Sequence, residues 1–405
     1  MNANRKNTLI LSFTLLVVML GYGMIQPIIP FLITKLGASG SDLGILASVY
    51  AAMQLVCAPL WGTLSDRIGR KPVLLIGVLG YAIAMFIFGM ATQFWMLFVA
   101  RTFSGVLSSA VMPTSMAYIS DNLPKDERSG AIGKLGAAVG LGVVLGPLIA
   151  GFLSTNSLSL PFFVGSALAA LALLLIFFLL PESHPAQGQA PAAQADSFWQ
   201  WNTLKKVLLG PAGVLMLLIF IIAFAMTNFQ GIIGLYVVKK FAFDTRQVGA
   251  IWMVLGAMMI VGQGVLSGPL AKRFGELAVI RSALFTGSVG FVALLLAQGF
   301  IPILAATAFF LLAVALISPA LTAYISTFGG ENQGAMMGMN TAFASLGRVA
   351  GPLWAGFSFD VNMSYPFISG AVALLAGFSI SLVFLPARQR QSSVPLPGQT
   401  GASRF

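Results

Sequence analysis

The sequence predicts an all-α, polytopic membrane protein with 12 transmembrane helices in two pseudo-symmetric six-helix bundles. The first observation is composition: 58% of the 405 residues are hydrophobic and 8% are charged, against roughly 25% charged in an average soluble domain. The second is a series of apolar runs of about 20 residues, the length of a helix that crosses a bilayer. The third is an internal repeat with an offset of about 205 residues.

The apolar runs give the elements in chain order. Several of them contain Gly and Pro, which membrane helices tolerate better than soluble helices do. The expected spans are 8–33, 44–65, 72–91, 94–118, 132–154, 160–181, 208–237, 247–270, 278–297, 299–325, 334–358 and 363–385.

The repeat is clearest in a Gly-Pro motif of two glycines four residues apart, a proline directly after them, and a third glycine. It occurs at Gly142, Gly146, Pro147 and Gly151, and again at Gly347, Gly351, Pro352 and Gly356. Small residues let membrane helices approach closely, so we expect the three glycines of each motif to share one packing face. The proline removes a backbone donor and bends the helix. Repeated halves of this kind usually form a transporter with its site between them.

The repeat and the spans divide the chain into four parts. We expect an N-terminal six-helix bundle over 1–181, a cytoplasmic linker over 182–206, a C-terminal six-helix bundle over 207–386 and a disordered cytoplasmic tail over 387–405. The linker is rich in Pro, Ala and Gln, a composition typical of flexible connections.

The basic residues indicate the orientation. With both termini in the cytoplasm, all but six of the 22 Lys and Arg residues fall in cytoplasmic segments. The exceptions are Lys35, Lys239, Lys240 and Arg246 on the outside, and Arg101 and Arg348 within spans. This is the positive-inside bias, so the net charge of +11 is a topology signal and not a nucleic-acid-binding surface. We expect a multi-pass protein of the inner or plasma membrane.

Few residues are available for catalytic chemistry. The chain has one His and one Cys, and it contains no zinc-ligand spacing, no phosphate-cradling glycine loop and no nucleophile elbow. We therefore predict no enzymatic activity, no cofactor and no metal site.

Several motifs resemble those of a known family. GTLSDRIGRKP, from Gly62 to Pro72, is similar to the signature loop of the major facilitator superfamily. The pattern from Gly133 to Gly151 resembles the fifth-helix motif of its antiporters, and LGYGMIQPIIP, from Leu20, resembles the first-helix motif of its twelve-helix drug/proton antiporters. LGASGSDLGIL and LFVARTFSG add further matches. The resemblance covers nearly the whole chain and is closest to Gram-positive multidrug exporters.

The signature loop suggests a gate. Gly62 and Gly69 permit close backbone approach and a tight turn, and Asp66 lies beside Arg67 and Arg70 at the cytoplasmic rim. The family resemblance implies that this loop latches the outward-facing state, often with an acid at the end of the fourth helix. A merely solvated, topology-setting loop is the alternative, because exposed ion pairs contribute only about 0–1 kcal/mol.

Asp121 occupies the place of that fourth-helix acid. The second repeat has Lys272 where the first has Asp66, so we expect the latch mainly in the N-terminal half. The predicted gating residues are Gly62, Asp66, Arg67, Gly69, Arg70 and Asp121, together with Gly142, Gly146, Pro147, Gly351 and Pro352 of the Gly-Pro motifs.

Arg101 is the most informative single charge, because an arginine in an apolar span must find partners in the bundle interior. It matches the fourth-helix arginine that the family resemblance links to proton coupling; snorkelling to the interface is the alternative. The family usually carries a carboxylate in the embedded cavity, but all 11 acids here fall in loops or at span ends. The coupling candidates are therefore Arg101 and a rim acid, Asp42 or Asp121. The role of Arg348 stays open.

We expect a neutral, lipophilic cavity, because helix seven has Gln230 where similar exporters have an acid. Amides and phenols set among Phe and Met suit varied apolar ligands. The predicted substrate-binding residues are Tyr22, Gln26, Gln54, Tyr118, Asn228, Gln230, Gln263, Tyr324 and Asn340.

Three functions are compatible with these observations. The resemblance favours a secondary active transporter that exports lipophilic drugs and antibiotics by alternating access, in exchange for protons. The missing carboxylate would suit a facilitator or a narrower transporter of a metabolite, sugar or lipid. The third is a non-transporting membrane receptor. The predicted partners are a small lipophilic substrate, protons and the lipid bilayer, without nucleic acid, and the predicted state is a monomer.

Overall fold

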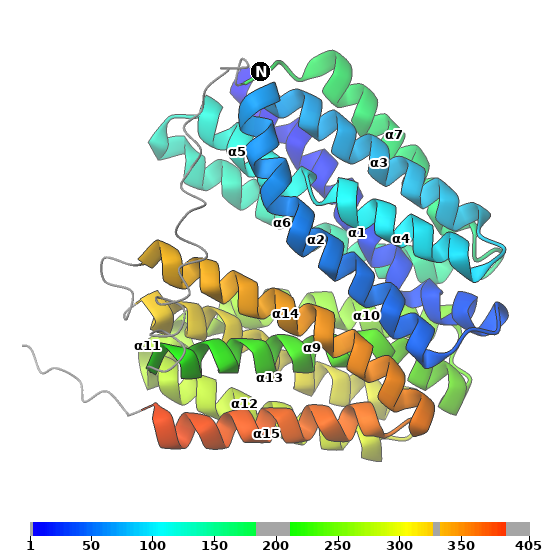
Figure 1. Cartoon of the computed structure of the whole chain (residues 1–405), viewed down its shortest axis with the longest axis vertical. Coiled ribbons are helices and arrows are strands. Elements are labelled where there is room, and N and C mark those ends of the chain that lie inside the picture. The colour runs from blue at the N-terminus through cyan, green and yellow to red at the C-terminus, as the bar shows by residue number, and fades with distance from the viewer. Residues whose placement is uncertain (1–2, 184–210, 327–332, 386–405) are drawn as a thin grey trace, which may run out of the picture.

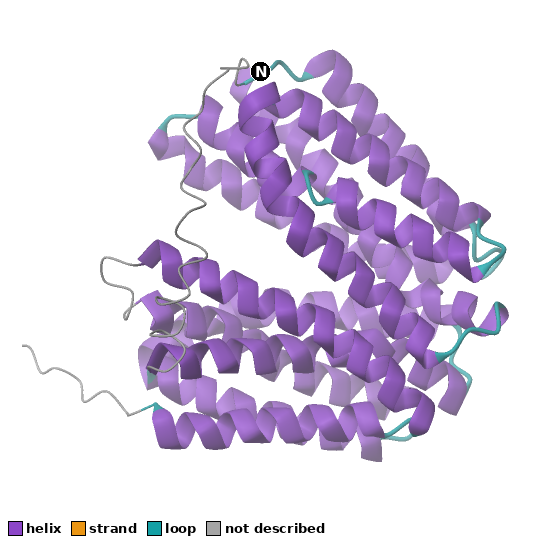
Figure 2. Ribbon diagram, viewed as in Figure 1, coloured by secondary structure: helices purple, strands orange, loops and turns teal. Residues whose placement is uncertain are grey.

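The computed structural model describes residues 3–183, 211–326 and 333–385. Within these ranges the regular structure is helical, and the connections between helices are short (Figure 2). Nearly all of the expected linker, 182–206, and the whole of the expected tail, 387–405, lie outside the described residues.

The N-terminal half consists of helices that cross the molecule in alternating directions (Figure 1). They are α1 (Ala3–Lys35), α2 (Gly40–Ile68), α3 (Arg70–Met90), α4 (Phe94–Ser108), α5 (Val111–Asn122), α6 (Lys125–Leu153) and α7 (Leu160–Leu179). Helices α4 and α5 together form the fourth span, Phe94–Asn122.

The C-terminal half repeats this arrangement. Its elements are α9 (Pro211–Phe241), α10 (Thr245–Met259), the π-helical segment η2 (Ile260–Leu266), α11 (Ser267–Phe274), α12 (Glu276–Leu296), α13 (Phe300–Ser326), α14 (Gln333–Val361) and α15 (Tyr365–Phe384). One span, Thr245–Phe274, runs through α10, η2 and α11. The all-α membrane fold with two bundles is therefore as predicted.

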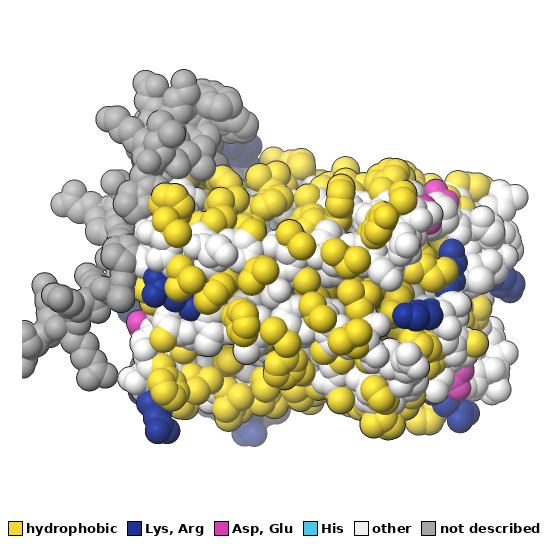
Figure 3. Space-filling model, turned by 90° about the horizontal axis from the view of Figure 1, so that it is seen from below, with side chains coloured by type: hydrophobic (Ala, Val, Ile, Leu, Met, Phe, Trp, Pro, Cys, Tyr) yellow, Lys and Arg dark blue, Asp and Glu magenta, His cyan; other side chains and the backbone are white. Residues whose placement is uncertain are grey.

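Eleven helices within the described residues are long and apolar enough to cross a membrane. The expected span 334–358 is present as α14, which is long enough but is not one of the eleven. The helix is less apolar than the other spans because it carries Asn340, Arg348 and Asp360, together with several Gly and Ser residues. Figure 3 shows one face of the molecule with hydrophobic side chains across its middle and charged side chains toward its two ends.

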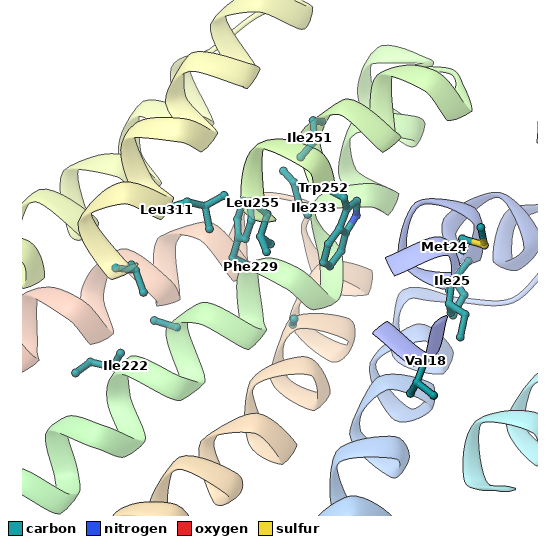
Figure 4. Packing of buried hydrophobic residues seen from close by; sticks show 14 of the residues in the cluster. Val18, Met24, Ile25, Ile222, Phe229, Ile233, Ile251, Trp252, Leu255 and Leu311 are labelled. Carbon is teal, nitrogen blue, oxygen red and sulfur yellow. The ribbon is translucent and has the colours of Figure 1, made fainter. Parts of the chain in front are cut away.

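Helices of the C-terminal half pack together through buried apolar side chains. In the C-terminal half, Phe229 of α9, Leu255 of α10 and Leu311 of α13 lie close together (Figure 4). The ring centroids of Phe229 and Phe310 are 5.0 Å apart, and those of Phe291 and Phe310 are 4.4 Å apart. Aromatic contacts of this kind hold the half together as a unit.

The first two glycines of each Gly-Pro motif pack within their own half. A Cβ on Gly142 would lie 2.7 Å from the carbonyl oxygen of Leu16 in α1, and one on Gly146 would overlap the backbone of Leu20. In the second half, Gly347 and Gly351 meet the backbone of α9 in the same way. These glycines therefore permit α6 to lie directly on α1 and α14 directly on α9.

The third glycine of each motif packs across the two halves. Gly151 of α6 meets Thr245 and Arg246 at the start of α10, and Gly356 of α14 meets Gly40 and Gly44 at the start of α2. The expectation that the three glycines share one face is therefore wrong. A step of five residues turns a helix by about 140°, so the third glycine points away from the other two.

The two halves touch mainly at one end of the molecule. Figure 1 shows them converging at the end where α2 and α10 begin, and diverging toward the end that carries the N-terminus. We call these the closed end and the open end. At the closed end, Ser48 of α2 donates a 2.7 Å hydrogen bond to the carbonyl oxygen of Val349 in α14. The Thr245 hydroxyl donates to the carbonyl oxygen of Gly151, at 3.2 Å.

Candidate substrate cavity and gate

A cavity of about 610 Å³ lies between the two halves. Its walls come from α1, α2 and α4 of the N-terminal half and from α9, α10, η2, α13 and α14 of the C-terminal half. This volume falls within the range of pockets that hold drug-sized ligands. Most of the wall is apolar, with Met19, Met226, Met259 and Trp252 among the large side chains.

Six of the nine predicted substrate-binding residues line this cavity. They are Tyr22, Gln26, Gln54, Gln230, Gln263 and Asn340. Gln263 lies in the π-helical segment η2, and such segments are frequent at functional sites because they displace the helix backbone. The cavity thus brings together neutral hydrogen-bonding groups from both halves.

The other three predicted residues do not line the cavity. The Tyr118 hydroxyl donates to the carbonyl oxygen of Pro181, at 2.9 Å, so this side chain ties α5 to the end of α7. The Asn228 amide is buried and donates to the carbonyl oxygen of Pro366, at 2.6 Å, so it faces α15. Tyr324 is buried near the end of α13 and is not part of the cavity wall. These three predictions were wrong because the residue type and the span do not show whether a side chain faces the cavity or a neighbouring helix.

Arg101 lines the cavity from α4, with only 3% of its surface exposed. Its Cζ atom lies 4.6 Å from the ring centroid of Tyr50 and 6.0 Å from that of Tyr22. The guanidinium thus contacts two tyrosine faces, but its Nε and Nη1 atoms are buried without a hydrogen-bond partner within the described part of the chain. Snorkelling is excluded for Arg101, because the side chain is buried among rings.

Sequence reasoning assigned no role to Arg348, yet it lines the cavity from α14 and is exposed there. Two further cavity-lining residues, Tyr50 of α2 and Thr227 of α9, were also not predicted from the sequence. Helical spacing could have found both, since Tyr50 lies four residues before Gln54 and Thr227 lies three before Gln230.

The described acidic residues lie at helix ends or between helices, and none lines the cavity. They are Asp42, Asp66, Asp121, Asp126, Glu127, Glu182, Asp244, Glu276 and Asp360. Asp42, a predicted coupling residue, is part of a capping box: its carboxylate accepts hydrogen bonds from the Ser39 backbone and hydroxyl, both at 2.8 Å. It therefore caps α2 at the closed end and is not part of the cavity wall.

The signature loop forms a compact ionic network at the open end. Arg70 contacts Asp66 with Nη1 at 2.6 Å and Asp121 with Nε at 2.9 Å. It also donates from Nη1 to the Ser65 hydroxyl, at 2.6 Å. The backbone N–H of Arg70 donates to Glu182, at 2.9 Å. The guanidinium of Arg70 in α3 thus joins α2 and α5, and the backbone of the same residue binds the segment after α7.

The remaining predicted gating residues of this loop have different surroundings. Gly69 has a φ of +101° and lies against the Glu182 carboxylate, so this turn requires glycine. Arg67 is exposed and lies outside the ionic network of Arg70, Asp66 and Asp121. A Cβ on Gly62 would meet no described atom within 4 Å. The loop's network lies wholly within the N-terminal half, whose partner half is distant at this end (Figure 1).

Comparison with known proteins identifies the family. The family model of the Major Facilitator Superfamily matches residues 11–352 and 215–404. The chain belongs to the Major Facilitator Superfamily. The predicted resemblance to this superfamily is therefore confirmed, and the chain is a multi-pass membrane transporter. The relatives described next also confirm the predicted resemblance to Gram-positive multidrug transporters.

Individual superfamily members match over nearly their full length. Multidrug resistance protein 2 of Bacillus subtilis is 31% identical over 385 residues, covering 95% of this chain and 96% of the relative. Multidrug resistance protein 1 of the same organism is 32% identical over 388 residues, with coverages of 95% and 98%. The quinolone resistance protein NorA of Staphylococcus aureus (strain MRSA252) is 30% identical over 381 residues, with coverages of 93% and 96%.

Solved structures agree on the superfamily fold. A bacterial homolog of the human lysosomal transporter Spinster, in an inward-facing and occupied conformation, superposes with a TM-score of 0.79. The match covers 93% of this chain and 96% of that chain at 14% sequence identity. At that identity the likeness concerns the fold alone.

Proposed function

We propose that this transporter exports lipophilic drugs from the cell by alternating access, in exchange for protons. The cavity carries the proposal: it lies between two quasi-equivalent halves, is mostly apolar, and offers hydrogen-bonding groups from both halves. The names of the Bacillus and Staphylococcus relatives, which match over nearly the full chain, support drug export.

The arrangement of the halves supports alternating access. The positive-inside bias favours an inward location for the open end, with both termini in the cytoplasm. The two sets of close contacts, α6 on α10 and α14 on α2, then form the outer gate of an inward-open state. A Cβ on Gly62 or Gly133 would meet no described atom within 4 Å outside the local backbone, and such small residues would permit close approach when the open end shuts.

Proton exchange is the proposed source of energy, with the proton site organised around Arg101. Of the earlier candidates, Asp42 is held in a capping box and Asp121 is paired with Arg70, and neither lines the cavity. Arg101, between Tyr22 and Tyr50, is the charged group at the cavity wall on α4.

A facilitator is the second candidate, favoured by the lack of an acid among the described cavity residues. We further propose that the protein is a monomer without enzymatic activity. Cells that lack other drug pumps would test the function: expression of this chain should lower the steady-state content of a fluorescent lipophilic dye, and an uncoupler should abolish the difference. Equal dye content with and without the chain, at verified expression, would contradict export.

A further inference from the structure

The cavity is not neutral, so this part of the expectation from the sequence is wrong. Its described lining contains two arginines, Arg101 and Arg348, and no Asp or Glu. The other polar groups of the wall are neutral amides, hydroxyls and phenols. The apolar parts of the wall reduce the screening of these charges by water, and no described acid offsets them, so we expect a positive potential in the cavity.

Arg101 is prepared for a planar anion. Tyr22 and Tyr50 contact the guanidinium with their rings, and the donors at Nε and Nη1 stay buried without a partner in the described chain. A buried donor without a partner is costly. A carboxylate or sulfonate would satisfy one of these donors through a paired contact that also uses Nη2, either Nε with Nη2 or Nη1 with Nη2, because its two oxygens match the spacing of such neighbouring N–H groups.

Arg348 supplies a second positive charge from the opposite half. It lies on α14, one residue after Gly347, which packs against α9. Its side chain is exposed to the cavity, and the described residues offer it no ion pair. An anion in the cavity would therefore interact with both halves of the protein, through Arg101 and Arg348.

We infer that the cavity selects lipophilic organic anions, compounds with an aromatic or aliphatic body and one carboxylate or sulfonate group, which Arg101 and Arg348 bind. This inference rests on the proposed transport function and specifies its substrate class. An anion is also driven outward by an inside-negative membrane potential, which at 100 mV favours export of one negative charge by about fifty-fold. The membrane potential thus adds to any proton gradient.

A matched series of pyrene compounds tests this selectivity. The probes are 1-pyrenesulfonate, 1-pyrenemethanol and 1-pyrenemethyl-trimethylammonium, which share one apolar body and carry a negative, no and a positive charge. Binding is measured by equilibrium dialysis to the full chain in nanodiscs of zwitterionic lipid, with empty nanodiscs as the background. We expect the sulfonate to bind at least about tenfold more tightly than the alcohol, and the ammonium compound to bind most weakly.

Variants at Arg348 assign the effect to the cavity. Arg348 is exposed, so its replacement is compatible with folding, whereas Arg101 is buried. Arg348→Gln should weaken sulfonate binding by about five- to tenfold and leave the alcohol within about twofold. Arg348→Lys should retain most of the sulfonate affinity. Arg273→Gln, which removes the same charge from an exposed position on α11 outside the cavity wall, should change nothing.

The outcomes separate this inference from the proposed function. Tightest binding of the ammonium compound, or an unchanged sulfonate affinity in Arg348→Gln, would overturn the anion preference while export of lipophilic compounds stands. An equal loss for all three probes would likewise assign Arg348 a structural role and overturn the preference. If none of the three binds to folded protein, the proposed function itself fails.

Discussion

The carboxylate of Asp360, at the end of α14, accepts hydrogen bonds from both the backbone N–H and the hydroxyl of Ser41, in the first turn of α2. The backbone N–H of Gly40 donates to the same carboxylate, at 2.7 Å. An acid from the C-terminal half thus caps a helix of the N-terminal half. The positive end of the α2 dipole favours this placement. In the proposed orientation the contact holds the outer gate shut.

We predict that Asp360→Ala shifts the protein toward the outward-open state. The loss of charge-assisted bonds at an exposed site is expected to destabilise the state with the closed end shut by about 1 kcal/mol. The ratio of outward-open to inward-open molecules should then rise by about fivefold. Spin labels at Ser157→Cys and Met363→Cys, in a Cys57→Ser background, would report the distance between the halves at this end. The variant should show a larger fraction of long distances.

Asp244→Ala is the matched control for this gate. Asp244 also caps a helix start at the closed end, but its carboxylate accepts from Gln247 of the same half, at 2.8 Å. Its loss should weaken α10 locally and leave the distribution between the halves unchanged. If both variants shift the distances equally, Asp360 has no special role in closing this end.

A second prediction concerns the signature loop at the open end. Asp66→Asn should reduce transport by about tenfold or more, a change of roughly 1.4 kcal/mol in the conformational cycle. Arg70 keeps Asp121 and Ser65 as partners, so folding and substrate binding should stay near normal. Transport into proteoliposomes, thermal stability and probe affinity would be measured on the same preparation.

The internal repeat supplies the control for Asp66. Lys272 occupies the corresponding position of the second half, where the described residues show no equivalent ion pair. Lys272→Ala should therefore transport at close to the unsubstituted rate. A normal rate for Asp66→Asn would remove the gate hypothesis, because the ion pair would then be a local feature of the N-terminal half.

The fold was predictable from the sequence because each determinant is local. Span length, the positive-inside bias and the repeat offset can be read without any knowledge of contacts. The offset of about 205 residues also makes Gly40 and Thr245 equivalent positions, and both lie at the closed end. The cavity was only partly predictable. Whether a polar side chain faces the cavity depends on helix rotation, which placed Gln230 inside and turned Asn228, two residues away, toward α15.

The cross-half contacts were the least predictable feature. Asp360 and Ser41 are 319 residues apart, and no motif in the sequence relates them. Arg348 was visible as a charge within a span, but its position at the cavity depends on how Gly347 and Gly351 place α14 on α9. Such relations arise from packing between distant segments and need the structure.

A third prediction concerns Gln230, which lines the cavity from α9. Gln230→Glu adds a negative charge to a cavity whose described charged groups are both arginines, and Coulomb attraction is strong where water is scarce. We expect affinity for a cationic probe to rise by about tenfold and affinity for an anionic probe to fall. Equilibrium binding of both probes would measure this exchange of preference.

Gln298→Glu provides the same added charge at an exposed position between α12 and α13, outside the cavity wall. It should leave both affinities unchanged. If Gln230→Glu folds normally and its selectivity also stays unchanged, Gln230 does not contact the ligand.

The last prediction concerns the energy source. In proteoliposomes with the electrical potential clamped at zero by potassium and valinomycin, an acidic lumen should drive uptake of 1-pyrenesulfonate, whose charge does not change with pH. Exchange for protons predicts an accumulation of about tenfold per pH unit for a one-to-one stoichiometry, since one pH unit is worth about 1.36 kcal/mol per proton.

Replacing Arg101 with Gln should abolish this dependence even where downhill flux persists, because the proton site is proposed to be organised around its guanidinium. If the pH gradient has no effect in the unsubstituted protein, while a substrate gradient alone drives flux, the transporter is a facilitator, and the lack of an acid among the described cavity residues is the physical reason.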